Sequence, residues 1–568
     1  MRAILWGAAF VVAAACLSRP SAQSTVREAP LGSSFLGAGP DTLLVDGVPI
    51  AGRTISFRLS GVDASTVVKV FASGVGGNGS VCKPATCLDL SPPVSLVGSG
   101  TADAEGSVDI PVVIPAGGAG RTAWYQAARV VSGAIGTTAV REVHFVEEQN
   151  ILVLLLDDLG VDQLGLMGLG SEIAPTPRID TLAAEGILFR HAYAQSICSP
   201  TRAALLTGRH GWRTGVSDGV EAEDDFALSL DEVLIPEMLA AGGGTPYDDS
   251  YVGKWHLCTL VDSMLDHPTM HGFSYYAGSL QGVAASSYTT DGLPQDYYDW
   301  ERVENGVAER TTTYVETDFV DTALTRVAAM TEPWFLMVGI SNPHYPVHEP
   351  PAELFTGPEV GDDEEDHQFH WMIEAMDTEI GRLLDSMDPA VLAHTTVILL
   401  SDNGTKGERV APDLDPERQK KTLYEGGVRV PMIVWGPLVS TPGREIDHLV
   451  EATDVFPTIA AIAGATLDPL IPIDGVSFLP YVVEPNVGPQ RASIFAEKTN
   501  VPGFDYRSRD QMIRDTQYKL IRFDGHDELY DLQDVDWEGT DLLADGADEA
   551  ETAIVDELAA LLPEDTGL

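Results

Sequence analysis

Two apolar runs in this chain, residues 151–156 and 395–400, are followed within three positions by oxygen-bearing side chains that could bind a metal ion. These side chains belong to Asp157, Asp158, Asp402 and Asn403. Carboxylate and amide oxygens suit Ca²⁺ or Mg²⁺, whereas zinc favours Cys and His. Taken singly, Asp158 could cap a helix and residues 402–404 could form a turn. Because two separate runs end in this way, the sequence predicts a divalent-cation site.

Two further strand-like segments end in basic residues. Residues 250–253 precede Lys254 and His256, and residues 334–340 precede the loop that contains His344. In open α/β sheets, ligands bind outside the carboxyl ends of the strands. We therefore expect these basic side chains to face the predicted metal ligands.

A cysteine precedes a predicted helix in the segment Cys198-Ser-Pro-Thr-Arg202. Ser199 is a favourable N-cap, Pro200 suits the first helical position, and Gly208 can end the helix. The helix dipole and free N–H groups favour an anion near Cys198, and Arg202 lies one turn away and can reach back to it. The alternative is a buried cysteine that packs as a small apolar residue.

Strand-like runs alternate with helical segments from residue 150 onward. The apolar runs at 151–156, 334–340, 395–400 and 430–434 are typical of strands buried on both faces, and residues 177–186 are predicted to be helical. This alternation predicts an α/β fold in which helices sandwich a large, mixed, mostly parallel sheet.

The N-terminal part has a different texture. Residues 24–146 contain alternating runs such as 54–59 and 107–114, separated by turn residues, and this pattern predicts an antiparallel β-sandwich. No residue in it suggests catalysis. A carbohydrate-binding or surface-attachment module is the functional alternative to a purely structural domain.

The C-terminal part returns to short strands after about residue 485. Segments 511–514, 518–523 and 528–532 predict a small antiparallel sheet. Residues 541–562 are predicted to form an acidic helical tail.

The first residues predict export to the periplasm or the extracellular space. Residues 1–23 combine Arg2, an apolar run and small residues, as signal peptides do, and Cys16 after three alanines gives lipoprotein anchoring as an alternative. No later apolar run reaches about 18 residues, so we expect no transmembrane span. Export to an oxidising compartment predicts a disulfide between Cys82 and Cys87.

Charge narrows the class of protein. Over 568 residues, 34 Lys+Arg against 85 Asp+Glu give a formal net charge of −51. A nucleic-acid-binding protein, which needs a basic face, is excluded, and 44% hydrophobic residues exclude a disordered chain. The acidity either keeps a solvated surface soluble or reflects a saline habitat, where salt screens self-repulsion.

Five ordered segments resemble the type I, formylglycine-dependent sulfatases of the alkaline-phosphatase-like superfamily. The nucleophile motif Cys-x-Pro-x-Arg of that family is similar to residues 198–202, and the match continues to Arg209. The other similar segments are residues 253–257, 343–346, 420–431 and 518–532. The resemblance covers roughly residues 147–568, and implies a catalytic domain at 147–485 and a C-terminal subdomain at 486–568.

The resemblance implies a sulfuric ester hydrolase. In the family, a formylglycine-generating enzyme oxidises the motif cysteine during export, so Cys198 would become formylglycine (3-oxoalanine). One hydroxyl of the hydrated aldehyde would attack sulfur and release the alcohol. The second hydroxyl would then help to expel sulfate.

The resemblance also assigns roles to individual residues. Ca²⁺, or alternatively Mg²⁺, would be held by Asp157, Asp158, Asp402, Asn403 and residue 198. Arg202 would orient the hydrated aldehyde, and Lys254 and Lys420 would neutralise sulfate. His344 would bind sulfate and protonate the leaving oxygen, and His256 would be the base that collapses the sulfated intermediate. Lys420 is preferred to Lys421 because it precedes Tyr424 by four residues, as the family lysine does.

Some positions depart from the family pattern. Cys258 stands where a glycine is usual, and residues 242–250 also differ, so the substrate is open: aryl sulfates, sugar sulfates or sulfated polysaccharides. His348 could line the pocket or lie in a surface loop. The alternative functions are a phosphonate or phosphodiester hydrolase that uses the same aldehyde, and a catalytically silent surface-binding protein.

Overall fold

The computed structural model describes residues 148–563, apart from gaps at 222–225, 260–263, 284–288, 358–360, 362, 500–502, 504–508 and 534, together with ten strands before residue 148. Two compact units divide the chain: Met1–Glu148 with Val483–Gly488, and Gln149–Val482 with Pro489–Leu568. The predicted signal segment 1–23, with Cys16, lies outside the described residues.

The first unit consists of antiparallel strands. One sheet has the order β1-β2-β7 and another the order β10-β8-β3-β6, with β9 paired to β8 and a separate hairpin β4-β5. The strands are β1 (Leu44–Asp46), β2 (Thr54–Leu59), β3 (Val67–Ser73), β4 (Val81–Lys83), β5 (Thr86–Leu88), β6 (Val94–Thr101), β7 (Val108–Val113), β8 (Thr122–Val131), β9 (Ala134–Thr137) and β10 (Arg141–His144). The runs predicted at 54–59 and 107–114 are β2 and β7. Gly98 of β6 lies against Ile110 of β7, so the two sheets face each other.

The two cysteines of the predicted disulfide lie on neighbouring strands. Cys82 and Cys87 are Cα partners across the β4–β5 hairpin. Their side chains are outside the described part of the structure, so the disulfide stays a prediction.

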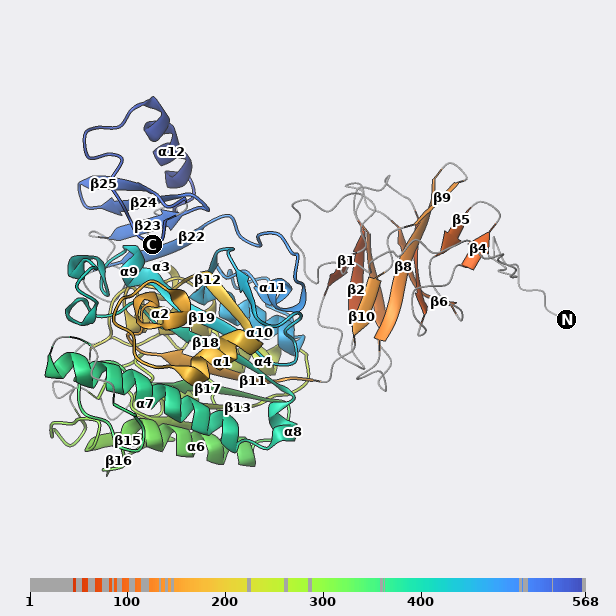
Figure 1. Cartoon of the computed structure of the whole chain (residues 1–568). Coiled ribbons are helices and arrows are strands. Elements are labelled where there is room, and N and C mark those ends of the chain that lie inside the picture. The colour runs from red at the N-terminus through yellow and green to blue at the C-terminus, as the bar shows by residue number, and fades with distance from the viewer. Residues whose placement is uncertain are drawn as a thin grey trace. The chain divides into compact units, whose positions relative to one another are not determined.

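An eleven-stranded mixed sheet forms the middle of the second unit (Figure 1). Its order is β16-β15-β14-β13-β17-β11-β18-β19-β12-β20, with β21 paired to β12. The strands are β11 (Asn150–Leu156), β12 (Ile187–Tyr193), β13 (Asp248–Gly253), β14 (Tyr276–Gly278), β15 (Trp300–Glu304), β16 (Val307–Thr311), β17 (Trp334–Gly339), β18 (Thr395–Ser401), β19 (Arg429–Trp435), β20 (Arg444–Ile446) and β21 (Val450–Glu451). The neighbouring strands β14, β13, β17, β11 and β18 are parallel to one another. Strand β19 is antiparallel to β18, and β15 and β16 pair antiparallel at the other edge of the sheet. The predicted mostly parallel sheet is confirmed.

Both faces of this sheet are buried, which explains the continuous apolar runs. Leu152 and Leu154 of β11 belong to a core with Phe319 of α6 and Ile373 of α7, while the alternate residue Val153 is buried on the opposite face. The longer helices are α1 (Pro177–Glu185), α2 (Cys198–Thr207), α6 (Val315–Ala329), α7 (Glu364–Ser386) and α10 (Val455–Ala463). The short helices are α3 (Gly211–Thr214), α4 (Ile235–Ala241), α5 (His267–Met270), α8 (Pro389–Leu392), α9 (Glu425–Val428) and α11 (Leu479–Val483).

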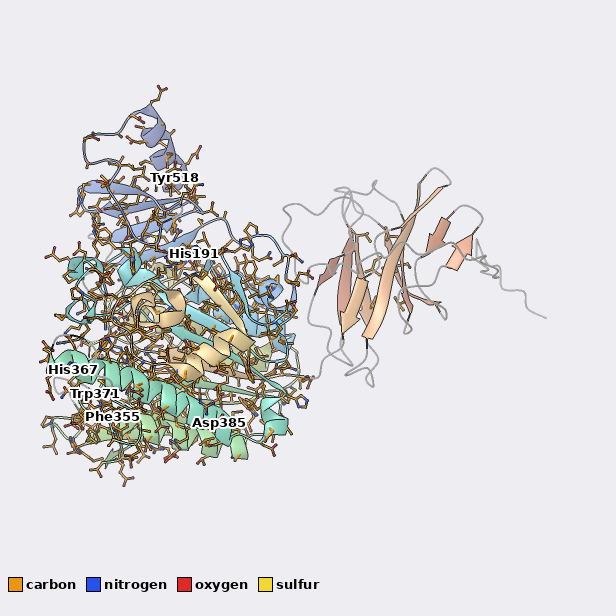
Figure 2. The ribbon with its side chains drawn as sticks, in the orientation of Figure 1. His191, Phe355, His367, Trp371, Asp385 and Tyr518 are labelled. Atoms are coloured by element: carbon orange, nitrogen blue, oxygen red, sulfur yellow. The ribbon has the colours of Figure 1, made fainter. Side chains whose placement is uncertain are left out.

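An aromatic pair joins helix α7 to the loop that contains Phe355. Phe355 stacks on Trp371 of α7 with ring centroids 4.9 Å apart, and the Trp371 ring also lies 6.1 Å from that of His367 (Figure 2). Helices α6 and α7 run side by side (Figure 1). Among the described helices, none is long and apolar enough to span a bilayer.

A small antiparallel sheet follows near the C-terminus (Figure 1). Its strands are β22 (Ile494–Lys498), β23 (Asp510–Arg514), β24 (Tyr518–Phe523) and β25 (His526–Asp531). The predicted helical tail is shorter than expected, because α12 spans Glu549–Ala559. Asp548 accepts hydrogen bonds from the Ala550 and Glu551 N–H groups and starts the helix there, so residues 541–547 precede it.

Candidate active site

The ends of two parallel strands bring the predicted oxygen ligands together. Leu156 of β11 is the register partner of Ser401 of β18, so the residues after them are neighbours. The Asp158 N–H donates to Asp402 Oδ1 at 3.3 Å, and Asn403 Nδ2 donates to Asp158 Oδ1 at 2.8 Å. Asp158 itself has a φ of 66°, a left-handed turn that carries the chain away from the sheet edge. All of these side chains are buried.

Helix α2 presents Cys198 to the same place. The Cys198 Sγ lies 3.5 Å from Asp157 Oδ1, 3.6 Å from Lys254 Nζ and 3.7 Å from Lys420 Nζ, and the residue is 1% exposed. The thiol therefore sits among both signs of charge. The sequence predicted Cys198 beside a helix N-terminus, in a position that favours an anion.

The predicted start of this helix was wrong by two residues. Helix α2 begins at Cys198 itself, with Ile197 at the N-cap, whereas Ser199 Oγ accepts a hydrogen bond from the Val220 N–H at 3.0 Å. Thr201 Oγ1 accepts from the Gln195 N–H at 2.9 Å and so fixes the entry to the helix. The helix ends at Gly208 with a φ of 69°, as predicted.

Arg202 is fully buried and binds two of the carboxylates that the sequence predicts as metal ligands. Its Nη2 and Nε lie 2.7 and 3.1 Å from Asp402 Oδ2, and its Nη2 lies 3.7 Å from Asp157 Oδ2. Its Nη1 donates to the Lys254 carbonyl at 2.6 Å. The structure shows these contacts with Asp402 and Asp157 and no hydrogen bond from Arg202 to Cys198, so the reach to residue 198 stays a prediction.

Each of the two lysines binds one aspartate. Lys254 Nζ lies 2.5 Å from Asp157 Oδ2, and Lys420 forms an ion pair with Asp158. Lys254 is positioned by Gly253 at the end of β13, where φ is 105° and a Cβ would lie 2.1 Å from the Gly339 carbonyl oxygen. Only glycine fits there, so the end of β13 can approach β17 closely.

The pKa values of Asp157 and Asp402 are shifted in opposite directions. Burial opposes ionisation of Asp157, but Lys254, His344 and Arg202 outweigh it and lower its pKa. Burial and the neighbouring charge of Asp157 raise the pKa of Asp402 to about 6, against the opposing effect of Arg202. Burial and mutual repulsion thus oppose ionisation of Asp402 although each carboxylate has a cationic partner, and a divalent cation would favour its ionised form.

The donor set fits a hard cation. Asn403 Oδ1 is buried and accepts no hydrogen bond from any described residue, so this amide oxygen is free to bind a metal. Asp157, Asp158, Cys198 and His344 each offer a ligand atom, and these atoms lie within 4.8 Å of one another. The described residues therefore contain a cluster that could hold a metal ion, made of two carboxylates, one thiol and one imidazole, with the Asn403 amide oxygen free beside it.

Two histidines line the cavity beside Cys198. His344 Nδ1 donates to the Tyr345 carbonyl at 2.7 Å, and its Nε2 lies 3.8 Å from Asp158 Oδ2. Burial and Lys254 lower the pKa of His344 to about 4, and lower that of His256 well below its usual range. Both rings are therefore neutral near pH 7 when no anion is bound.

A cavity of about 610 Å³ opens above Cys198. Its lining includes Asp158, Cys198, Lys254, His256, His344 and Lys420. Tyr345, from the family-like segment 343–346, also lines it, and the wider lining adds residues that the sequence analysis did not identify: Glu221, Gln281, Glu408 and Glu417. No motif marks these rim residues, because they come from separate loops whose sequences follow no general pattern.

Other histidines and cysteines of interest lie outside this cavity. His348 does not line it; the ring stacks on Tyr297 with centroids 4.2 Å apart. His191 on β12 lies toward the C-terminal sheet (Figure 2), and His210 pairs with Glu451 at 3.2 Å. Burial raises the pKa of Cys258 to about 12, so this thiol is unreactive.

The chain matches models of known families. A model described as Sulfatase matches residues 149–465, and one described as N-sulphoglucosamine sulphohydrolase, C-terminal, matches residues 418–565. The first match spans more than half of the chain and contains the end of every strand that contributes to the site.

Individual relatives agree with this match. The chain is 32% identical over 367 residues to N-acetylgalactosamine-6-sulfatase from Homo sapiens, which covers 59% of this chain and only 66% of that relative's length. It is 32% identical over 370 residues to arylsulfatase A from Bos taurus, which covers 61% of this chain and 70% of the relative.

Solved structures share the fold. The structure of Ps i-CgsB in complex with k-i-k-neocarrahexaose aligns with a TM-score of 0.61 and 25% identity, covering 73% of this chain and 92% of that one. The structure of BT4656 in complex with its substrate D-glucosamine-2-N,6-O-disulfate aligns with a TM-score of 0.57 and 20% identity, covering 73% and 97% of the two chains. From its strand-end site and from these matches, this chain belongs to the sulfatase family.

Proposed function

We propose that this protein hydrolyses a sulfate monoester through residue 198 after its conversion to formylglycine. The observation that carries the proposal is the position of Cys198, whose Sγ lies within 3.7 Å of Asp157, Lys254 and Lys420 on the floor of the cavity. Two lysines beside a metal-ligand cluster form a site for a small anionic group. A sulfate ester presents such a group.

The unmodified thiol is a poor nucleophile in this position. Burial and Asp402 raise the pKa of Cys198 well above its usual range, so the thiolate that attacks or binds metal is scarce. A hydrated aldehyde at the same position needs no thiolate. This favours the formylglycine mechanism over a cysteine nucleophile.

The reaction then has two stages. One hydroxyl oxygen of hydrated residue 198 attacks sulfur, and the bond from sulfur to the alcohol oxygen breaks. In the second stage the other hydroxyl loses its proton, the aldehyde C=O reforms, and the bond from carbon to the sulfate oxygen breaks. Water hydrates the aldehyde again, so residue 198 is regenerated.

The surrounding residues would bind the sulfate group and transfer protons. Lys254 and Lys420 would hold the sulfate group, and Arg202 would hold Asp402 and Asp157 in place. The Nδ1–H of His344 is committed to the Tyr345 carbonyl, so Nε2 carries a proton only when the ring is an imidazolium. The negative charge of a bound sulfate ester would favour that form, and Nε2–H would then deliver its proton to the leaving oxygen. His256, neutral in the free site, would accept the proton of the second hydroxyl.

Asp157, Asp158, Asp402, Asn403 and residue 198 would hold a divalent cation, for which we propose Ca²⁺ with Mg²⁺ as the alternative. When bound, this cation supplies positive charge that polarises the sulfate oxygens and the hydroxyl of residue 198. The free Oδ1 of Asn403 supports this assignment.

We propose a sulfated carbohydrate as the substrate. The names of two similar proteins point to sugar substrates, and the rim offers Tyr345, 52% exposed, as a surface for a sugar ring. Lys406 Nζ lies 4.9 Å from the centre of the Tyr345 ring. Half of the chain's eight lysines line this cavity and offset its four carboxylates, Asp158, Glu221, Glu408 and Glu417, within a chain of net charge −51.

We further propose that the protein is exported, with residues 1–23 removed, and meets a formylglycine-generating enzyme on the way. Residues 24–146 would form an accessory β-sandwich domain, residues 147–485 the catalytic domain and residues 486–568 the C-terminal subdomain.

The first test combines mass spectrometry with an assay. Protein from a host with the maturation enzyme is digested, and the peptide from His191 to Arg202 is examined for an aldehyde in place of the thiol. Cys198→Ala should abolish turnover of an aryl sulfate, whereas Cys258→Ala, the other buried free cysteine of the described residues, should keep it. An unmodified thiol, or faster turnover of an aryl phosphodiester, would contradict the proposal.

A further inference from the structure

The loop that carries His344 is held by side chains from distant parts of the sequence. Glu316, at the start of α6, accepts hydrogen bonds from the Ser341 and Asn342 N–H groups at 2.9 and 2.7 Å. Tyr297 lies close to two carbonyls of the same loop: its hydroxyl is 3.0 Å from Ser341 O and 2.7 Å from His344 O. One hydroxyl therefore joins the two ends of the turn 341–344.

Tyr297 is itself rigidly held. The residue is 1% exposed, and its ring stacks on His348 at 4.2 Å and packs against Tyr314 at 6.2 Å between centroids. Burial and Glu316 raise the pKa of Tyr297 well above its usual range, so its hydroxyl keeps its proton and remains a donor. A donor on a fixed ring defines the position of both carbonyl oxygens.

The carbonyl of His344 belongs to the residue whose imidazole faces Asp158. The ring of His344 is fixed at Nδ1 by the Tyr345 carbonyl, so its remaining freedom is that of the loop backbone. Tyr297 binds carbonyl oxygens of that backbone, and Glu316 binds its N–H groups. Neither side chain lines the cavity, so neither touches a bound substrate.

We propose that Tyr297 is a positioning residue that sets the place of His344 Nε2 relative to the leaving oxygen. This inference rests on the proposed function, in which His344 protonates that oxygen. As the bond from sulfur to oxygen breaks, its electron pair passes to the alcohol oxygen, and the Nε2 proton of His344, present in the imidazolium form that a bound anion favours, neutralises it. The contribution of this proton to the rate grows with the pKa of the leaving alcohol. Displacing His344 should therefore lower kcat most for esters whose leaving alcohol has a high pKa.

Tyr297→Phe removes only the hydroxyl oxygen and tests the proposal directly. With an alkyl or sugar sulfate, we expect kcat to fall about 10- to 100-fold, because a displacement of about 1 Å can cost that much. With 4-nitrophenyl sulfate, whose leaving group needs little protonation, the change should stay within about twofold. Tyr298→Phe is the matched control, because its hydroxyl donates to Glu349 O at 2.7 Å on the protein surface.

A double-mutant cycle separates positioning from a general structural role. In the His344→Ala background, Tyr297→Phe should cause no further loss on the alkyl sulfate, because its effect passes through His344. An equal fall on every substrate, or a full additional loss in the His344→Ala background, would overturn the proposal. Failure of the proposed function is separate and visible in the unmodified sequence alone, as an absence of sulfate ester hydrolysis.

Discussion

At the scale of single residues, the site is defined by which polar atoms have partners. Arg202 and the two lysines bind three carboxylates, yet the Oδ1 of Asn403 has no partner among the described residues. Leaving a buried amide oxygen without a hydrogen bond costs about 1–3 kcal/mol. A bound cation would remove this cost, so the proposed metal would contribute to stability as well as to chemistry.

Asn403→Ala should therefore weaken metal binding without removing any charge. We expect added Ca²⁺ to raise the melting temperature of the metal-free protein, and the variant to need roughly 10- to 100-fold more Ca²⁺ for the same rise. The measurement is a series of thermal melts against free Ca²⁺, repeated with Mg²⁺. Asn486→Ala, at an exposed position, is the control. An identical response of the Asn403 and Asn486 variants would contradict the assignment of Asn403 as a ligand.

Glu316 predicts a pH dependence of stability. Burial raises its pKa to about 8, whereas an unfolded glutamate titrates near 4.3. The contribution of Glu316 is therefore fully present below the unfolded pKa and is lost as pH rises through about 8, because only the unfolded state releases its proton freely. Glu316→Gln keeps an acceptor for the Ser341 and Asn342 N–H groups but cannot titrate.

Relative to its difference from the unmodified sequence near pH 5, the variant should gain about 4 kcal/mol in stability by pH 8.5. Melting temperatures across this range measure the difference. Glu557→Gln on the exposed face of α12 should follow the unmodified sequence throughout. A constant offset between the Glu316 variant and the unmodified sequence would mean that Glu316 is already ionised at pH 5.

At the scale of elements, the sequence predicted what continuous apolar runs determine. Strands β11, β17 and β18 were predicted to within one residue, because burial on both faces requires uninterrupted apolar side chains. The residues at their carboxyl ends were predicted with them, since parallel strands end at one edge. Such positions need no knowledge of the loops.

Elements set by single side-chain contacts were not predictable in the same way. The start of α2 depends on Thr201, which binds the backbone of Gln195, and the start of α12 depends on the cap at Asp548. Tyr297 and Glu316 are separated from His344 by dozens of residues and belong to no motif. Only the folded structure brings these residues to the loop that they hold.

The end of β13 gives a prediction at this scale. Gly253→Ala would place a Cβ 2.1 Å from Gly339 O, so β13 must move away from β17 and carry Lys254 with it. We expect a loss of more than about 3 kcal/mol in stability and a fall of about 100-fold or more in kcat. Gly243→Ala is the matched control, since its φ is also positive at 72° but no atom lies within 4 Å of the added Cβ. It should cost only about 1 kcal/mol, for backbone strain, and should leave kcat unchanged. Equal effects of the two substitutions would show that the contact with β17 does not determine the position of Lys254.

At the scale of the whole molecule, the C-terminal sheet is joined to the site through a buried charge network. Glu425 of α9 binds Lys519 at 2.9 Å and Arg514 at 3.2 Å, and also accepts a hydrogen bond from Tyr193 at 2.8 Å. Since Glu425 lies five residues after Lys420, the C-terminal sheet fixes the segment that delivers this lysine. The C-terminal family match, which begins at residue 418, includes both parts.

Net charge and local charge have opposite effects on an anionic substrate. The chain carries a formal charge of −51, which repels sulfate esters at long range, whereas Lys254 and Lys420 attract them within the buried site. Salt screens exposed charges beyond a Debye length of about 10 Å at 0.1 M but affects buried pairs much less. Added salt should therefore remove the repulsion and spare the attraction.

We expect kcat/KM for an aryl sulfate to rise about 3- to 10-fold between 0.01 and 0.3 M NaCl, since repulsion of the approaching anion controls the rate of encounter. The melting temperature should rise over the same range, because self-repulsion of the folded chain is screened as well. KCl at equal ionic strength is the control for a specific ion effect, and sulfate salts are avoided because sulfate is the product. A fall in kcat/KM with salt would mean that the lysines at the site, rather than the net charge, control the approach of substrate. Stability that stayed flat over the same range would count against a chain adapted to a saline habitat.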